Sequence, residues 1–160
     1  MADSVNFEIT GLDEVIKKMN DLSVGIRNKA GKRALAKAAA VVRAAARENA
    51  LGVNDPGTRE EIAKNIAIQY MSRRNRLNGD QGYRVGIRGG SRDMSAYGEF
   101  GGKGKENPGG DTWYWRFVEF GTERTAAKPF MRPALENNTQ KATNAFAAEL
   151  EKQIDKIIGG

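Results

Sequence analysis

The sequence predicts an α+β protein: a small, mainly antiparallel sheet packed by a long basic helix and a long C-terminal helix, with an extended glycine-rich loop. Apolar residues recur at helical spacing along residues 26–50 and 135–158 and alternate with polar residues along 66–70 and 83–87. Residues 88–111 contain 8 glycines and few apolar anchors. At 160 residues the chain has the length of one domain, so we expect a single domain over residues 1–160.

The N-terminal residues predict a strand and then a short helix. Val5, Phe7 and Ile9 alternate with polar residues, which is typical of a strand with one buried face. Thr10 is expected to be the N-cap of the helix, with Asp13 three residues later. The apolar residues at helical spacing are Leu12, Val15, Ile16, Met19 and Leu22.

Residues 26–50 predict a long helix with an alanine-rich face and a basic face. The first face consists of Ala30, Ala34, Leu35, Ala38, Val41, Val42, Ala45 and Ala46, and the opposite face carries Lys29, Lys32, Arg33, Arg43 and Arg47. The net charge of the chain is +6, and residues 23–51 alone carry +6. The basic face is either the solvated side of a core helix, or a surface that meets an acidic subunit or DNA phosphate.

A turn, a short helix and a hairpin are expected next. Residues 54–57 (Asn-Asp-Pro-Gly) are strong turn formers, and Thr58 with Glu61 forms a capping box for a helix that ends near Lys64. Glu60 and Glu61 are neighbours whose side chains point about 100° apart on a helix, so we assign them to the cap rather than to acid–base chemistry.

An arginine-rich connection joins the two strands of the predicted hairpin. Ile66, Ile68 and Tyr70 mark the first strand, and Tyr83, Val85 and Ile87 mark the second. Arg73, Arg74 and Arg76 lie at the tip of the connection. They are either solvated charge or a group that grips carboxylates of an adjoining subunit.

Residues 88–111 are much longer than the usual loop of about 4 to 6 residues in a compact domain. Gly-Gly-Lys-Gly-Lys within this loop lacks the spacing of a phosphate-binding loop, so nucleotide binding is not expected. Loops of this length are disordered or functional. Tyr97 and Phe100 are its natural anchors for docking on a neighbour.

An aromatic cluster around one carboxylate follows, in Trp-Tyr-Trp-Arg-Phe-Val-Glu-Phe-Gly-Thr (113–122). Its periodicity fits a helix or a strand, and Gly121 permits a positive φ at a sharp turn. Glu119 is expected to be partly buried and therefore to need arginine or backbone N–H partners. The nearby arginines are Arg116, Arg124 and Arg132. Glu119 either fastens its own turn or forms an ion pair between subunits.

The C-terminal helix is expected to begin near two prolines and to run to Ile158. Pro129 and Pro133 bracket Phe130-Met131-Arg132, with Pro133 in the first helical turn. One apolar stripe contains Leu135, Phe146, Leu150, Ile154, Ile157 and Ile158, while Lys141, Lys152, Asp155 and Lys156 lie away from it.

Composition excludes many kinds of catalytic site. The chain has no cysteine and no histidine, so thiolate and imidazole metal sites and Ser-His or Cys-His catalytic pairs are impossible. An enzyme that used carboxylates with magnesium would need converging acidic residues, and the sequence offers no such cluster. We therefore expect no enzyme, no cofactor and no metal. No secretory signal or membrane-spanning run is expected either.

The chain resembles the tail-completion and head–tail joining proteins of long-tailed bacteriophages. The residues that carry the resemblance are Phe117, Val118, Glu119, Phe120, Gly121, Thr122, Pro129, Phe130, Arg132 and Pro133. Residues 117–122 and 129–135 are its specific parts, and the rest of the chain matches in order and length. A proline-threonine-glycine run that is usual in the family appears here as Asn-Asp-Pro-Gly-Thr at residues 54–58.

This resemblance implies a structural protein of the virion tail or neck, assembled in the host cytoplasm. Copies of the chain, expected to number six, would form a ring at the head-proximal end of the tail. The ring would join the tail tube or terminator protein to the head connector or stopper protein, with DNA passing through without sequence-specific binding and no membrane partner. Candidate interface residues are Arg73, Arg74, Arg76, Tyr97, Phe100, Glu119, Arg124 and Arg132. The alternative function is that of a basic DNA-binding protein.

Overall fold

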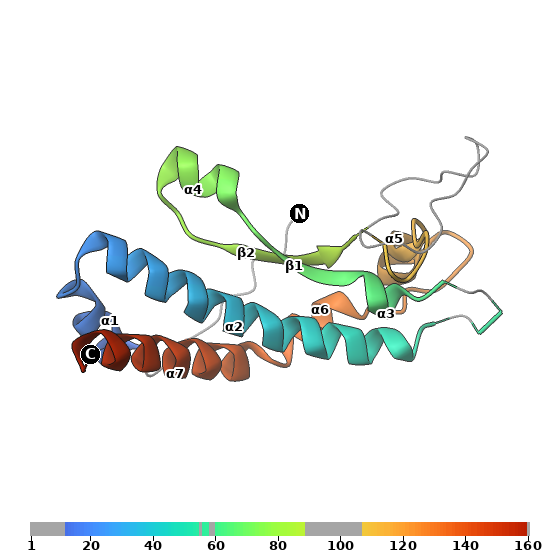
Figure 1. Cartoon of the computed structure of the whole chain (residues 1–160). Helices are drawn as coiled ribbons and strands as arrows, with labels where there is room; N and C mark the ends of the chain where they lie inside the picture. Colours follow the sequence, from blue (N-terminus) through green and yellow to red (C-terminus); the bar gives the residue numbers. More distant parts are fainter. Residues whose placement is uncertain (1–11, 55, 58–59, 89–106, 160) are drawn as a thin grey trace. The chain divides into compact units, whose positions relative to one another are not determined.

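The computed structural model describes residues 12–54, 56–57, 60–88 and 107–159 (Figure 1). Its elements in chain order are α1 (Asp13–Asn20), α2 (Val24–Leu51), α3 (Ile62–Asn65), β1 (Ile66–Tyr70), α4 (Ser72–Asn78), β2 (Tyr83–Ile87), α5 (Trp115–Phe120), α6 (Met131–Glu136) and α7 (Thr139–Ile158). β1 and β2 pair as a two-stranded antiparallel sheet. The predicted α+β class is confirmed.

Some predictions lie outside the described residues. They concern the strand around Val5, Phe7 and Ile9 and the loop anchors Tyr97 and Phe100; Thr10 and Thr58 themselves are also outside, although the helix starts next to them are described. The chain divides into two compact units, and the single domain stays a prediction. Unit 1 contains Met1–Val41, Tyr70–Tyr83 and Thr139–Gly160, and unit 2 contains Val42–Gln69 and Arg84–Asn138.

Unit 1 has a core formed by α1, the first part of α2 and α7. Its buried residues are Val15, Ala30, Ala34, Leu150 and Ile154, with Met19, Leu22, Phe146 and Ala147 packed around them. The two alanines of α2 leave room for large side chains from α1 and α7. α1 lies along α7 (Figure 1).

Unit 2 has its own core beneath the sheet. The buried residues are Ala46, Ala50, Ile62, Ala63, Ile66, Phe130 and Ala134, and Val85, Ile87, Trp115 and Met131 are among the residues packed against them. Asn49 on α2 donates a hydrogen bond to the carbonyl of Phe130 at 3.1 Å. The second part of α2, the sheet and the start of α6 therefore share one apolar core.

The two faces predicted for α2 are confirmed, but several cations of the basic face interact with other residues of the chain. In unit 1, the Lys32 ammonium lies 4.1 Å from the centre of the Tyr70 ring, and Arg33 donates a hydrogen bond to Gln153 at 2.8 Å. In unit 2, Arg47 donates two hydrogen bonds to the carbonyl of Ile66, the shorter one at 2.8 Å. These three cations serve tertiary structure within the chain.

The capping box predicted for Thr58 and Glu61 is wrong. Helix α3 begins at Ile62, and Glu61 is its N-cap residue in an extended conformation without a side-chain cap bond. The backbone N–H of Glu61 instead donates to the carbonyl of Gly109 at 2.7 Å, and its carboxylate binds Lys64 at 2.6 Å. For α1, the N-cap residue is Leu12, two residues after the predicted Thr10.

Two further elements differ from prediction. The arginine-rich connection contains helix α4, which ends at Gly79 with a φ of 74°. The predicted single C-terminal helix is two helices, α6 and α7, with an interruption at Asn137 and Asn138. The Asn138 side-chain amide donates to the carbonyl of Ala134 at 3.0 Å. A side-chain donor thus satisfies the carbonyl that a continuing helix would bond with its backbone, and the helix ends.

The predicted apolar stripe is correct only in its middle. Leu150 and Ile154 are buried, whereas Leu135, Ile157 and Ile158 are exposed. The stripe assumed one continuous helix, whereas Leu135 belongs to α6 and Leu150 to the separate helix α7.

Candidate functional site

The predicted aromatic cluster forms a short helix and a tight turn in unit 2. Residues 115–120 form α5, which settles the ambiguity between helix and strand. Gly121 ends the helix with a φ of 76°, as predicted. The Thr122 hydroxyl accepts hydrogen bonds from the backbone N–H groups of Arg124 at 3.2 Å and Thr125 at 3.1 Å. The turn then returns the chain to α5, where Lys128 donates to the carbonyl of Val118 at 2.8 Å.

Glu119 is the centre of this segment. The residue is 1% exposed, and its carboxylate accepts hydrogen bonds from three consecutive backbone N–H groups. These belong to Phe130 at 2.7 Å, Met131 at 2.9 Å and Arg132 at 3.1 Å. The three donors lie at the start of α6, where N–H groups have no partner within the helix. The next residue, Pro133, has no N–H, so Glu119 satisfies every unpaired donor at this helix end.

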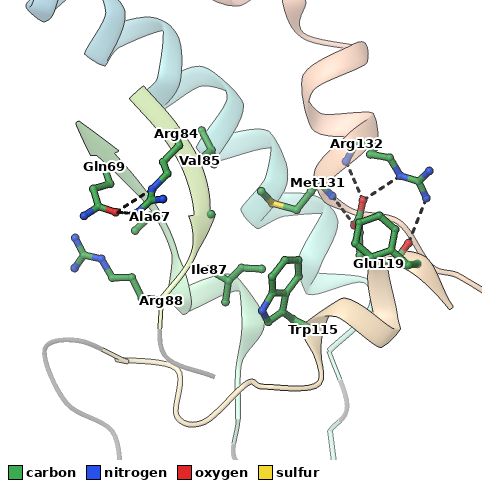
Figure 2. Close-up of a pocket in the computed structure, with 12 residues that line it drawn as sticks. Ala67, Gln69, Arg84, Val85, Ile87, Arg88, Trp115, Glu119, Met131 and Arg132 are labelled. Carbon is green, nitrogen blue, oxygen red and sulfur yellow. Dashed lines mark hydrogen bonds and ion pairs between the residues drawn. The ribbon is translucent and has the colours of Figure 1, made fainter. Parts of the chain in front are cut away.

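Arg132 completes the arrangement from the solvent side. Its Nε lies 3.4 Å from the Glu119 carboxylate, and its Nη2 donates to the Glu119 carbonyl at 3.4 Å (Figure 2). Its guanidinium also lies 5.4 Å from the centre of the Phe120 ring. Arg116 instead lies over Trp115, and Arg124 is exposed. Among the three arginines predicted as partners of Glu119, Arg132 is the one in contact, and Glu119 fastens its own turn.

Large aromatic side chains lie on the outside of this fastened segment. Phe117 is 50% exposed and Phe120 is 63% exposed, although both belong to a helix anchored by a buried residue. The Trp113 ring supports Phe117 edge-on, with centroids 5.8 Å apart. We call α5 with Phe117 and Phe120 the aromatic knob.

A groove lies beside the knob, within unit 2. Its volume is about 480 Å³, and on the side of the sheet it is lined by Ala67 and Gln69 of β1 and by five consecutive residues of and after β2, from Arg84 to Arg88. Trp115, Phe120, Met131 and Arg132 are on the other side. Figure 2 shows Ile87, Trp115 and Met131 around the same space. We call this hollow the β2 groove; a smaller one of about 200 Å³ lies beside Phe117 and Thr122.

Asn65 holds a second buried polar network, which was not predicted from the sequence. Its side chain is fully buried and donates to the carbonyl of Gly110 and the hydroxyl of Thr112, both at 2.8 Å. It also accepts from the N–H of Gly109 at 2.7 Å. A Cβ at Gly109 would collide with the carbonyl of Glu61. Residues 107–111, predicted as part of a loop that awaits a partner, are thus packed within unit 2.

Glu60 and Asp111 bring two carboxylates together beside this network. Partial burial raises the pKa of Glu60, the negative charge of Asp111 adds to the rise, and a hydrogen bond with Tyr114 opposes it. In the described part of the chain, no three acidic residues gather in a way that could hold a metal ion.

The predicted interface residues that the structure describes are divided between the two units. Arg73 and Arg76 are exposed on α4 in unit 1, and Arg74 belongs to the same helix. Glu119, Arg124 and Arg132 belong to unit 2. Arg124 makes only its backbone bond to Thr122 among the contacts described. None of the described helices combines the length and the apolar character needed to span a bilayer.

Comparison with known proteins gives one family. A family model described as "Bacteriophage HK97-gp10, putative tail-component" matches residues 13–121, which include α5 and Gly121. No match was found among curated proteins or among solved structures. Because the family model covers well over half of the chain, this protein belongs to the HK97 gp10-like family of bacteriophage tail components.

Proposed function

We propose that copies of this chain, expected to number six, close into a ring at the head-proximal end of the tail or in the neck. The ring joins the tail tube or terminator protein to the head connector or stopper protein and leaves a channel through which DNA passes without sequence-specific contact. Assembly takes place in the host cytoplasm. Membership of a family of tail components supports a role in the virion.

The aromatic knob is the observation that carries the proposal. Buried hydrogen bonds hold Glu119 in place, while Phe117 and Phe120 project apolar surface into solvent. Exposed aromatic side chains on a rigid support lose little conformational entropy on docking and are typical anchors of protein interfaces. A ring also needs contacts between two different surfaces of the same chain. The knob is suited to be one of these surfaces.

Complementation of a phage that lacks the protein tests this function. We expect the double variant Phe117→Ser, Phe120→Ser to fold but to fail in complementation, giving free heads and unjoined tails. Ile158→Ser is the control, because Ile158 is a 70% exposed hydrophobic residue near the end of α7. Normal, filled and tailed virions in the complete absence of the protein would disprove the proposed function.

The arginines of α4 are proposed as a second contact. Arg73 and Arg76 are exposed, and Leu77 beside them is 73% exposed. A basic and apolar surface of this kind fits an acidic partner subunit. Replacing Arg73 and Arg76 with glutamate is expected to lower ring formation without lowering the stability of the purified chain.

The DNA-binding alternative gains no support from α2. Lys32, Arg33 and Arg47, three of the five cations of the predicted basic face, already interact with Tyr70, Gln153 and Ile66 within the chain. Strong, salt-dependent binding to duplex DNA that is lost on charge reversal of Arg43 would restore this alternative.

A further inference from the structure

β2 lies along the β2 groove, which Ala67 and Gln69 of β1 also line, and the edge of β2 away from β1 carries no third strand in the described residues. Met71 donates to the carbonyl of Gly82 and Arg88 donates to the carbonyl of Asn65, each at 2.9 Å, which fixes the register of the hairpin. Backbone groups alternate in direction along an antiparallel strand. Val85 and Ile87 therefore direct their N–H and C=O groups away from β1, and no other strand in the described residues pairs with them.

The groove has the properties of a site that accepts an extended segment. It follows β2 continuously from Arg84 to Arg88, and Trp115 and Met131 give its opposite side apolar surface. A two-stranded sheet is marginal alone, and an open edge beside a groove is the geometry in which one more strand adds to a sheet. A Cβ at Gly86 would meet no atom within 4 Å, so this face of the strand is uncovered there.

The charges along the groove indicate which side chains the incoming segment should have. Arg84 and Arg88 are exposed in the groove lining, and Gln69 is the hydrogen-bond partner of Arg84 at 3.0 Å. The carboxylate of Glu119 is already engaged by backbone donors. An incoming strand with apolar residues on one face and a carboxylate on the other fits this lining.

The chain contains such a segment at its N-terminus. Val5, Phe7 and Ile9 alternate with polar residues that include Glu8, and residues 1–22 carry a net charge of −3, whereas the rest of the chain is basic. The segment and the β2 groove are different parts of the chain. Each copy therefore has one donor and one different acceptor, which is what a closing head-to-tail contact requires.

We propose that residues 5–9 of one copy add as a strand to the free edge of β2 in the next copy, with Glu8 facing Arg84 or Arg88. This proposal rests on the ring of the proposed function and assigns the contact that closes it. The apolar residues of the donor strand extend the layer of Val85 and Ile87, and backbone hydrogen bonds supply the sequence-independent part of the contact.

Engineered thiols test the contact in virions, since the natural chain has no cysteine. A phage lacking the protein is complemented with Glu8→Cys, Gly86→Cys chains, and particles are oxidised and run on a non-reducing gel. We expect covalent species of two or more chains. A second pair, Glu8→Cys with Arg84→Cys, covers the neighbouring register. Lys152→Cys, on the exposed side of α7, is the control acceptor, and we expect it to give at least ten-fold less cross-linked product.

The outcomes separate the possible occupants. Co-expressed chains with different tags, one Glu8→Cys and the other Gly86→Cys, should give a mixed dimer. A disulfide confined to single chains would mean that the N-terminal segment docks on its own sheet, and the absence of any disulfide with both acceptors would mean another occupant. Either result overturns the proposal while leaving the ring intact; normal virions without the protein would instead disprove the ring.

A charge exchange provides a second measurement. Glu8→Lys and Arg84→Glu should each lower the yield of joined particles, and the double variant should restore it. Arg84 is exposed and Glu8 lies near the start of the sequence, so we expect both single variants to keep the fold. Circular dichroism verifies this. A double variant no better than the single variants would contradict the pairing of Glu8 with Arg84.

Discussion

Replacing Glu119 with glutamine removes the acceptor that joins α5 to the start of α6. One carboxylate oxygen accepts from Phe130 and Met131, and the other accepts from the backbone and Nε of Arg132. Glutamine has nearly the same shape but offers one acceptor oxygen and one NH₂ group. Whichever way the amide is oriented, its NH₂ group faces two donors in a site that is 1% exposed.

The expected loss of stability follows from the two hydrogen bonds that the NH₂ group of glutamine cannot accept. Hydrogen bonds to charged groups contribute about 1.5 to 3 kcal/mol each, and buried donors left without acceptors carry a desolvation penalty, so we expect a loss of about 3 kcal/mol. For a chain of this size the corresponding decrease in unfolding temperature is roughly 6 to 12 °C.

Urea and thermal unfolding followed by tryptophan fluorescence measure this loss, because Trp113 and Trp115 lie directly before and within α5. Glu123→Gln is the matched control, since Glu123 is an exposed glutamate in the same turn and should change stability by less than about 0.5 kcal/mol. If Glu119→Gln is as stable as this control, the carboxylate does not fasten the segment and the reasoning is refuted.

Three other substitutions test the surroundings of the site. Gly121→Ala should cost about 2 kcal/mol or more in urea unfolding, because φ is 76° and the new Cβ would lie 2.8 Å from the N of Ala127; an unchanged midpoint would mean that the turn relaxes freely. Asn65→Ala should cost about 3 kcal/mol in the same assay, since it leaves three buried groups unpaired. Burial and Asp111 raise the pKa of Glu60, so its ionisation opposes folding and stability falls as pH rises past its unfolded pKa near 4.5. Glu60→Gln should therefore gain stability relative to the wild-type protein between pH 4 and 7, and equal pH profiles would contradict this sign.

Local periodicity predicted much of the fold correctly. The inner face of α2, the two hairpin strands and the positive φ at Gly121 each depend on residues close in sequence. The helical state of α5 was not predictable in this way, because Trp113, Phe117 and Phe120 fit one period while Trp115, Phe117 and Glu119 fit the other. Tertiary contacts of Glu119 with α6 decide between them.

The missed features depend on partners distant in sequence. The hydrogen bonds of Asn65 with Gly109, Gly110 and Thr112 join residues that no local pattern links. The available signal in the sequence was the pair of adjacent glycines, Gly109 and Gly110, before the polar Asp111. The interruption between α6 and α7 arises from one side-chain bond of Asn138. Similarly, charge and proximity in sequence suggested three arginines for Glu119, and only the packing of α6 against α5 selects Arg132.

The motif that carries the family resemblance combines two physical roles that experiments can separate. A six-residue helix such as α5 is too short to persist alone, so its order depends on Glu119 and the donors between Pro129 and Pro133. Phe117 and Phe120 contribute little to that order because at least half of each side chain is in solvent. Substitutions at Glu119 should therefore lower assembly in parallel with stability. Substitutions at the two phenylalanines should lower assembly while stability is retained, which distinguishes a docking surface from a structural support.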